Sequence, residues 1–447
     1  MARRTRMLAA GMGLLLGAIL PSACFRSNTD PHSIDVLVGE NPQYASAQKA
    51  WFARIQREFK AQTGASVHFE TYTDLSEEQT KLETSAVTST GPDVYLLGTT
   101  FTPVAFSTKS FMQLSEADWK KIGGRQRFFQ PQLAMSGPDR AHQIGVPMSM
   151  RPFGMVYNTE LFKKAGIAGP PKTWNEFVAD AKKLTDPSKK VYGAAIDYAD
   201  DADPWKYIWT QVRQSGGDLV SRDQRKSLLA SPQVKKAFSF YFGLLTKDKV
   251  TDPKSIGWKA TDALAAFASG KAAMLPMVTP SSAPTLLKSP VKGKYALATM
   301  PLVPYGYSSR PAGGVGAGSI VSGDNMAVAD YSEHKALALK YIALVTSKRE
   351  QAHYSKVFGD LPSNQQAAAE VAAKNSQTQQ WIKAERVALP TAYTGAWSNV
   401  QLALGNVVAQ SLDPLSHGSF SDSDVTKLLN AGNATVQSSL NRANRDR

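Results

Sequence analysis

Cysteine is almost absent from this chain, since Cys24 is the one cysteine among 447 residues. A single thiol cannot form an intrachain disulfide or supply a cysteine-based zinc site. The 6 histidines are scattered, and none belongs to an HExxH motif or a close ligand pair. A GxSxG nucleophile elbow is also missing. The sequence therefore carries no motif of a metalloenzyme or a serine hydrolase, and we expect no metal and no cofactor.

Long hydrophobic runs are lacking except at the N-terminus. Residues 7–20 are uncharged and apolar, and they follow Arg3, Arg4 and Arg6. This run is shorter than the roughly 20 residues that a membrane-spanning helix needs. A basic head before a short apolar run is typical of an export signal. We therefore predict a signal peptide over residues 1–23 and a polar tether over residues 24–33.

The residues before Cys24 resemble the lipobox of bacterial lipoproteins. Ser22 and Ala23 are small, although Pro21 stands where that motif usually has leucine. In the lipoproteins, the cysteine carries lipid and becomes the mature N-terminus. The resemblance implies that Cys24 is lipidated and holds the exported protein at the cell membrane. The alternative is a leftover cysteine in the tail of the signal.

Positive charge is in excess, with 51 lysines and arginines against 37 acidic residues and a formal net charge of +14. A basic surface can attract nucleic acid, an anionic membrane or an anionic ligand. Nucleic-acid-binding motifs and dense basic blocks are absent from the sequence. We therefore expect no nucleic-acid partner, and membrane proximity explains the excess.

Strands and helices alternate along the first hundred residues of the expected mature chain. Strand patterns at 34–39, 66–73 and 92–98 are separated by helical patterns at 45–64 and 76–91. This order predicts an α/β fold with a parallel sheet and crossover helices. Ligands of such sheets bind beyond the carboxyl ends of the strands. The remaining length, roughly 420 residues, favours two domains.

Four segments, in order, resemble the extracellular solute-binding proteins, family 1, of ABC importers. They are "GPDVYLLGTTF" (91–101), "IGVPMSMRPFGMVYNTELFKKAG" with its continuation (144–185), "AFASGKAAMLPM" (266–277) and "SGDNMAVADY" with its continuation to "LPSN" (322–364). The resemblance implies a type II-like periplasmic-binding-protein fold, with two lobes joined by a multi-segment hinge. It also implies a monomeric, non-enzymatic binder that delivers a carbohydrate to permease subunits.

The division into lobes is predicted from the same resemblance. Residues 34–146 and 276–322 are expected in one lobe, and residues 147–275 and 323–447 in the other. The chain is expected to cross between them at 144–150, 274–277 and 321–326. Glycines at 313, 314, 316, 318 and 323 fit the backbone rotation of a hinge, and close packing of a loop is the alternative.

Aromatic side chains are candidates for sugar platforms, because their flat apolar faces pack against sugar rings. Those expected in loops at the cleft are Tyr44, Phe101, Trp205, Trp258, Tyr393 and Trp397. Plain packing is the alternative for each. The tryptophans Trp51, Trp174 and Trp381 fall on amphipathic helices and are expected in the core.

Polar candidates follow the predicted strands or lie in the hinge. They are Glu40, Asn41, Asp74, Thr99, Arg151, Thr279 and Asp324. Thr279, with its neighbours Ser281 and Ser282, stands where the family often has glycine and tryptophan. Arg151 offers a planar donor for hydroxyls, a carboxylate or a phosphate, or else forms an interlobe salt bridge.

An acidic run, "DYADDADPW", contains Asp197, Asp200, Asp201 and Asp203. It lacks the central glycine and the terminal glutamate of an EF-hand calcium loop. We therefore interpret it as a solvated loop or as acceptors for sugar hydroxyls.

The leading interpretation is an exported, lipid-anchored receptor that captures a carbohydrate for an ABC permease. An anionic solute such as a glycerophosphodiester is the first alternative. A secreted glycoside hydrolase, which needs two opposed carboxylates, is a remote one. An adhesin or a sensor without a transport role is the third.

Overall fold

The computed structural model describes residues 30–73 and 75–445. The predicted signal peptide, Cys24, most of the tether and Asp74 therefore lie outside the described residues. No helix in this described part combines the length and the apolar character that crossing a membrane requires.

The first sheet has six strands in the order β11-β4-β10-β3-β1-β2. Strand β1 (Ser33–Gly39) pairs in parallel with β2 (Ser66–Tyr72) and β3 (Val94–Gly98). Helices α1 (Ala45–Thr63) and α2 (Leu75–Thr88) make the crossovers. This confirms the predicted parallel sheet. The three later strands join antiparallel and are β4 (Gly145–Met150), β10 (Gly323–Val328) and β11 (Leu361–Pro362).

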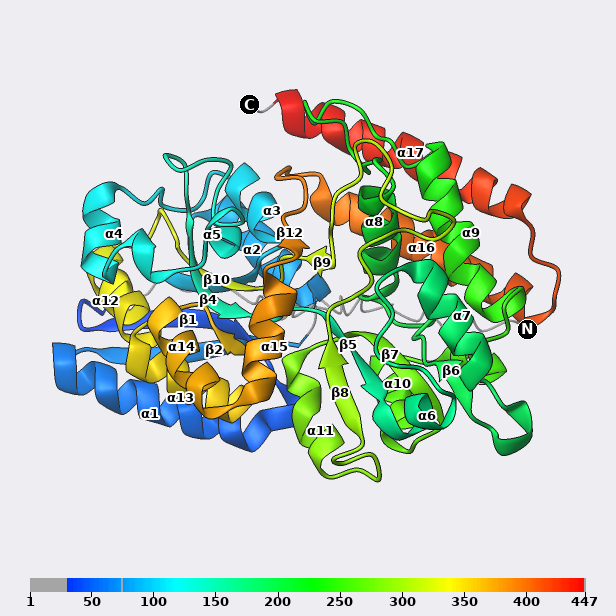
Figure 1. The fold of residues 1–447 in the computed structure, drawn as a ribbon. Coiled ribbons are helices and arrows are strands. Elements are labelled where there is room, and N and C mark those ends of the chain that lie inside the picture. The colour runs from blue at the N-terminus through cyan, green and yellow to red at the C-terminus, as the bar shows by residue number, and fades with distance from the viewer. Residues whose placement is uncertain (1–29, 74, 446–447) are drawn as a thin grey trace, which may run out of the picture.

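The second sheet has four strands in the order β6-β7-β5-β8. Their bounds are β5 (Gly154–Asn158), β6 (Tyr192–Ala194), β7 (Ala272–Val278) and β8 (Tyr295–Ala298). Every residue of β7 is buried, as expected for a strand covered on both faces. We call the half built on the six-stranded sheet the first lobe and the half built on the four-stranded sheet the second lobe (Figure 1).

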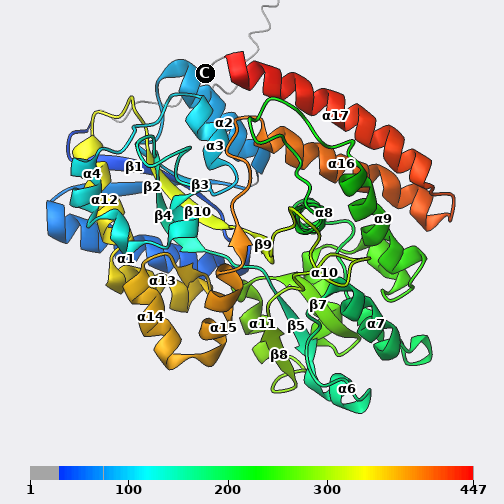
Figure 2. The same cartoon turned by 45° about the horizontal axis from the view of Figure 1, so that its top comes forward.

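Helices cover each sheet. The first lobe carries α3 (Thr102–Ser107), α4 (Glu116–Ile122), α5 (Gln130–Leu133), α12 (Lys335–Val345), α13 (Lys348–Phe358) and α14 (Gln365–Lys374). The second lobe carries α6 (Thr159–Lys164), α7 (Trp174–Leu184), α8 (Pro204–Gln214), α9 (Pro232–Thr246), α10 (Ala260–Ala268), α11 (Ala283–Leu287), α16 (Trp397–Ser416) and α17 (Asp422–Arg445). Helix α15 (Ser376–Glu385) packs between the two halves. Figure 2 shows α16 and α17 side by side over the second lobe.

The sheets correct the predicted division of the chain. Strand β10 was expected with residues 147–275, but it pairs with β3 and β4 in the first lobe. Residues 276–322 were expected in the first lobe, yet the end of β7 and all of β8 pair with β5 in the second lobe. The prediction failed because order along the chain does not reveal which antiparallel strand inserts into which sheet.

Three crossings join the lobes in the described chain. Residues 151–153 link β4 to β5, and residues 319–322 lead from the second lobe into β10. The third crossing is at 386–396, where β12 (Ala388–Leu389) pairs with β9 (Ser319–Ile320). The predicted crossing at 274–277 is wrong, because those residues lie inside β7. The crossing predicted at 144–150 is also misplaced, because those residues form β4 and the chain crosses directly after them; the one predicted at 321–326 overlaps the observed crossing at 319–322.

Glycine is required at the start of β10. Gly323 has a φ of +149°, and an added Cβ would lie 2.0 Å from the carbonyl oxygen of Ser149. A side chain there would separate β10 from β4. Gly314 and Gly318 instead fit the packing alternative, because a Cβ added at either position would collide with Gln214 or Val387.

Separate cores support the two lobes. In the first lobe Trp51 packs with Phe59 and the α12 side chains. In the second lobe Trp174 packs with residues of α8, α9 and α16. Trp381 joins a smaller cluster with Met150 and Val156, beside the first crossing. All three tryptophans are buried, which confirms their predicted place in the core.

Candidate functional site

A cavity of about 1100 Å³ lies between the two lobes. Residues 98–101 and Gln79 of the first lobe form one side. Residues 197–203, the first turn of α8 and the end of β7 form the other, together with one face of α16. The floor comes from the crossings, at Arg151, Phe153 and residues 320–323. The volume lies just above the usual range for small-molecule sites, which is roughly 300–1,000 Å³.

Five of the predicted residues line this cavity: Thr99, Phe101, Arg151, Trp205 and Thr279. Ser281 and Ser282 line it as well. Thr99 follows β3 and donates a hydrogen bond to the Val321 carbonyl at 3.3 Å. The Thr279 and Ser281 hydroxyls lie 2.9 Å apart. These residues come from both lobes and from a crossing, which is the arrangement that a closing cleft requires.

Three predicted residues after β1 do not line the cavity. Glu40 is exposed and accepts a hydrogen bond from the Thr71 hydroxyl. Asn41 accepts one from the Tyr44 amide and so caps the short helix η1 (Pro42–Tyr44). The Tyr44 hydroxyl reaches the Ser281 carbonyl of the second lobe at 3.3 Å.

Four other predicted residues lie near the cavity without lining it. Trp397 is fully buried behind Trp205, with ring centroids 5.9 Å apart. Tyr393 packs edge-on against Phe106 of the first lobe, and Trp258 packs against the cluster around Trp381. Asp324 is buried behind Arg151. Asp74 is outside the described residues.

Arg151 is engaged by two carboxylates at the cleft edge of the first lobe. Its guanidinium donates to both oxygens of Asp324, at 2.8 and 2.5 Å, and to Asp360 at 3.2 Å. Burial alone would lower the pKa of Arg151, but Asp324 and Asp360 outweigh it and raise that pKa. Burial also raises the pKa of Asp360 to about 6, against the effect of Arg151. Both acids lie in the first lobe, so the network is not an interlobe salt bridge.

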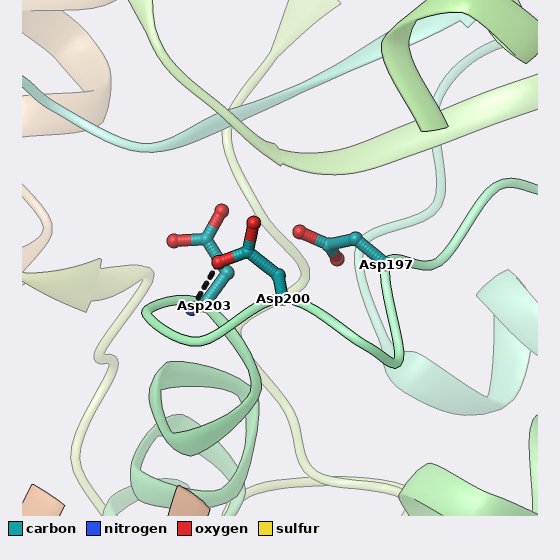
Figure 3. Close-up of side chains that lie close together, drawn as sticks. All are labelled: Asp197, Asp200 and Asp203. Atoms are coloured by element: carbon teal, nitrogen blue, oxygen red, sulfur yellow. Dashed lines mark hydrogen bonds between the residues drawn. The ribbon is translucent and has the colours of Figure 1, made fainter. Parts of the chain in front are cut away.

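Three carboxylates crowd together on the opposite wall. Carboxylate oxygens of Asp197, Asp200 and Asp203 all lie within 4.8 Å of one another. Figure 3 shows the Asp197 carboxylate pointing towards Asp200 from the same loop. Burial, followed by the charges of Asp203 and Asp200, raises the pKa of Asp197 well above its ordinary value. The raised pKa of Asp197 favours its protonated form, so this carboxyl can donate a hydrogen bond as well as accept one.

The loop itself holds this cluster in place. Asp200 accepts backbone hydrogen bonds from Ala202, Asp203 and Ala260, at 2.8 to 3.1 Å. Asp203 is paired with Lys206, whose ammonium lies 4.6 Å from the centre of the Phe153 ring. These carboxylates could hold a cation or accept hydroxyl hydrogen bonds.

The face that α16 turns to the cavity was not predicted. Ser398, Gln401, Gly405, Ala409 and Leu412 line it at spacings of three and four residues. The opposite face, which includes Val400, Leu404, Val407 and Ser411, is buried in the core. This periodicity was readable from the sequence, but it fits any surface helix equally well. Phe153, Tyr198 and Lys206 also line the cavity and were not singled out.

The cavity can bind a polyhydroxylated solute without a net negative charge. Hydroxyl groups and carboxylates supply acceptors and donors, while Phe101, Phe153 and Trp205 supply apolar faces. Among the described lining residues the cations are Arg151 and Lys206, and carboxylates bind both. An anion entering the cavity would find both cations already paired with carboxylates.

Comparison with known proteins identifies the family. A model described as "Bacterial extracellular solute-binding protein" matches residues 55–386. A putative binding protein of Brucella abortus is 26% identical over 359 residues, which cover 80% of this chain and 82% of the relative. The diacetylchitobiose binding protein DasA of Streptomyces coelicolor is 27% identical over 360 residues, with coverages of 74% and 76%.

Solved structures share the fold. Maltose-bound MalE3 of T. maritima superposes with a TM-score of 0.72 at 21% identity, covering 92% of this chain and 99% of its own. A solute-binding protein of Agrobacterium radiobacter in complex with ribitol gives 0.70 at 22% identity, with coverages of 91% and 98%. The two-lobe α/β fold is thereby confirmed. The chain belongs to the bacterial extracellular solute-binding proteins.

Proposed function

We propose that this protein is the extracytoplasmic substrate-binding component of an ABC importer and that it captures a neutral carbohydrate between its lobes. The observation that carries the proposal is the cavity itself. Both lobes line it with hydroxyls and aromatic faces, the second lobe adds carboxylates, and the two cations of the cavity are paired with acids. Membership of an extracellular solute-binding family supports the location and the transport role.

The names of relatives support the class of ligand. DasA is named for binding diacetylchitobiose, and the structures of similar fold hold maltose, ribitol and D-mannitol. All four ligands are uncharged polyols or sugars. An anionic glycerophosphodiester, the alternative suggested by the basic composition, finds Arg151 already bound to Asp324 and Asp360. The pairing of Arg151 therefore argues against that alternative.

The position of the acids supports binding without turnover. A glycosidase needs two carboxyl groups on opposite sides of the scissile bond. The grouped carboxylates of this cavity, at Asp197, Asp200 and Asp203, lie on one wall and on one loop. A sugar against this wall would donate hydroxyl hydrogen bonds to acids on one side only. Closure of the lobes over the solute would then present a loaded receptor to the permease subunits.

Calorimetry with the purified protein tests the ligand class. Maltose, diacetylchitobiose, ribitol and mannitol form the neutral set, and glycerophosphocholine with glycerol 3-phosphate forms the anionic set. We expect heat of binding from a member of the neutral set and none from the anionic set. Binding of an anionic solute that Arg151→Ala abolishes would contradict the proposal. Chromatography of the incubated sugar tests for turnover, which we expect to be absent.

The lipid anchor at Cys24 is part of this proposal. An import receptor is useful only beside its permease, and a cysteine that carries lipid would hold it there. After cell fractionation, we expect wild type in the membrane fraction and the Cys24→Ser variant in the soluble fraction. Both proteins should bind ligand with the same affinity. If the two proteins were distributed equally between the fractions, the proposed anchor at Cys24 would be contradicted, and the proposed receptor role would stand.

A further inference from the structure

A hydrogen bond joins the lobes away from the three chain crossings. The hydroxyl of Tyr44, in η1 of the first lobe, donates to the backbone carbonyl of Ser281 at 3.3 Å. Ser281 belongs to η5 (Pro280–Ser282), which directly follows β7 of the second lobe. The two residues are 237 positions apart in the sequence. This bond can therefore exist only when the lobes are close together.

The surroundings of Tyr44 hold its ring ready for this contact. Asn41 fixes the turn through the Tyr44 amide at 3.2 Å. Phe358, at the end of α13, packs edge-on against the Tyr44 ring with centroids 6.2 Å apart. Next to it, an added Cβ on Gly359 would lie 3.4 Å from Ser281. The first lobe thus presents a packed tyrosine and a bare backbone to η5.

Ser281 connects this contact to the cavity. Its hydroxyl lies 2.9 Å from the Thr279 hydroxyl, and both residues line the cavity. Ser282 donates to the Thr279 carbonyl at 2.7 Å, so the turn behaves as one unit. A solute that binds the Thr279 and Ser281 hydroxyls would steady the turn whose carbonyl receives Tyr44. Solute binding and lobe contact would then stabilise each other.

We propose that Tyr44 is a positioning residue that holds the lobes closed and thereby tightens solute binding without touching the solute. The inference rests on the proposed function for its ligand arm, but not for its effect on closure. A hydroxyl that makes one net hydrogen bond shifts an equilibrium by roughly 2- to 10-fold. Tyr44→Phe removes that hydroxyl and keeps the ring against Phe358.

Pulsed electron–electron double resonance, which measures the distance between two spin labels, tests closure of the ligand-free protein directly. Spin labels are placed at exposed positions of the two lobes, Val87→Cys and Leu287→Cys, in a full chain that carries Cys24→Ser. We expect Tyr44→Phe to move population from the shorter to the longer interlobe distance. Identical distance distributions with and without the hydroxyl would overturn the proposal. This arm needs no ligand, so its result stands even if the proposed function fails.

Calorimetry supplies the second arm, with maltose, diacetylchitobiose and ribitol as probes. We expect Tyr44→Phe to weaken the affinity of any probe that wild type binds by roughly 2- to 10-fold. An unchanged or tighter affinity would overturn the proposal. If wild type binds no probe of the full panel, the proposed carbohydrate function is at fault, and the spin-label result still decides the role of Tyr44.

Two control variants separate closure from other effects. Tyr331→Phe also removes a tyrosine hydroxyl, but its bonds to Tyr95 and to the Pro92 carbonyl lie within the first lobe. We expect it to leave the interlobe distances unchanged. Ser281→Ala keeps the carbonyl that Tyr44 uses and removes the hydroxyl at the cavity. It should leave the free distances unchanged and weaken binding, and a shift like that of Tyr44→Phe in either control would contradict the assignment.

Discussion

The two walls of the cleft use charge in opposite ways. On the first lobe, Arg151 binds Asp324 and Asp360, so each charge has an opposite partner. On the second lobe, three aspartates lie within 4.8 Å of one another, and Lys206 pairs with one of them. A paired network stabilises the fold, because removing one member leaves a buried charge without an opposite charge beside it. Crowded acids cost stability and are available to a solute, so the difference separates structural charge from binding charge.

The largest effect is expected from breaking the paired network. Asp324→Ala leaves Arg151 with one carboxylate, and we expect it to lower the free energy of unfolding by roughly 2–4 kcal/mol. Urea denaturation measures the change. Asp201→Ala is the matched control, because that exposed side chain forms a surface pair with Lys259 worth less than about 1 kcal/mol. Equal losses in the two variants would show that the network is not structural.

The crowded wall should respond in affinity rather than stability. Asp197→Asn keeps the shape but replaces the hydroxyl of the protonated carboxyl, which can donate and accept a hydrogen bond, with an amide NH₂ group that only donates, and we expect it to weaken carbohydrate binding by roughly 10-fold. Calorimetry with the sugar that wild type binds gives the affinity, and thermal melting gives the stability. Because burial and the charges of Asp203 and Asp200 already raise the Asp197 pKa, the melting temperature should not fall. Unchanged affinity together with a lower melting temperature would reverse the contrast between the walls.

A pH titration sharpens the comparison on the first lobe. Burial, followed by the charge of Asp324, raises the pKa of Glu78 on α2 from 4.5 to about 8. The folded state therefore binds this proton more tightly than the unfolded state. The resulting stabilisation is complete below pH 4.5 and is lost as the pH rises through 8. We expect Glu78→Gln to flatten the fall in stability over this window by on the order of 1–3 kcal/mol.

Unfolding curves measured at several pH values, between 4.5 and 8.5, check this effect. Glu83→Gln is the control, because Glu83 is exposed on the same helix. Parallel pH profiles for wild type and Glu78→Gln would mean that the Glu78 carboxyl does not retain its proton in the folded protein.

The smallest effect concerns the length of the solute. Gln401 lines the cavity from the second turn of α16. We expect Gln401→Ala to weaken binding of a trisaccharide roughly 3- to 10-fold and to leave binding of a monosaccharide unchanged. Equal losses for both sugars would place Gln401 against the first sugar unit. Gln410, on α16 but not among the residues that line this cavity, provides the control substitution to alanine.

Much of the fold could be predicted because local signals were strong. Alternating strands and helices up to residue 98 led to the parallel sheet, and Gly64 ends α1 in the left-handed conformation that glycine favours. Thr173 caps α7 through a reciprocal pair of hydrogen bonds with Glu176. The partners of β7 and β10 could not be predicted in this way. Their sheets are chosen by contacts far apart in sequence, which no local pattern encodes.

The candidate site was predicted where it follows a strand or the hinge. Thr99, Arg151 and Thr279 reach the cavity for that reason. Glu40 and Asn41 also follow a strand, but neither lines the cavity. Asn41 caps η1, and Glu40 accepts a hydrogen bond from the Thr71 hydroxyl. Trp397 looked like a loop residue, yet it begins α16 and faces the core. The face of a helix that borders a cavity is fixed by tertiary packing, which explains why the α16 wall was missed.

The three crossings have a consequence for how the chain is made and exported. Because the number is odd, β1 begins in one half while α17 ends in the other. The six-stranded sheet of the first lobe is incomplete until β11, near residue 361, has been synthesised. The core of the second lobe is incomplete until α16 and α17 have been synthesised. The second lobe cannot be finished while the last fifty residues are still on the ribosome, because these residues form nearly all of α16 and α17. A chain that reaches its final shape so late is well suited to threading through a translocation channel before it folds.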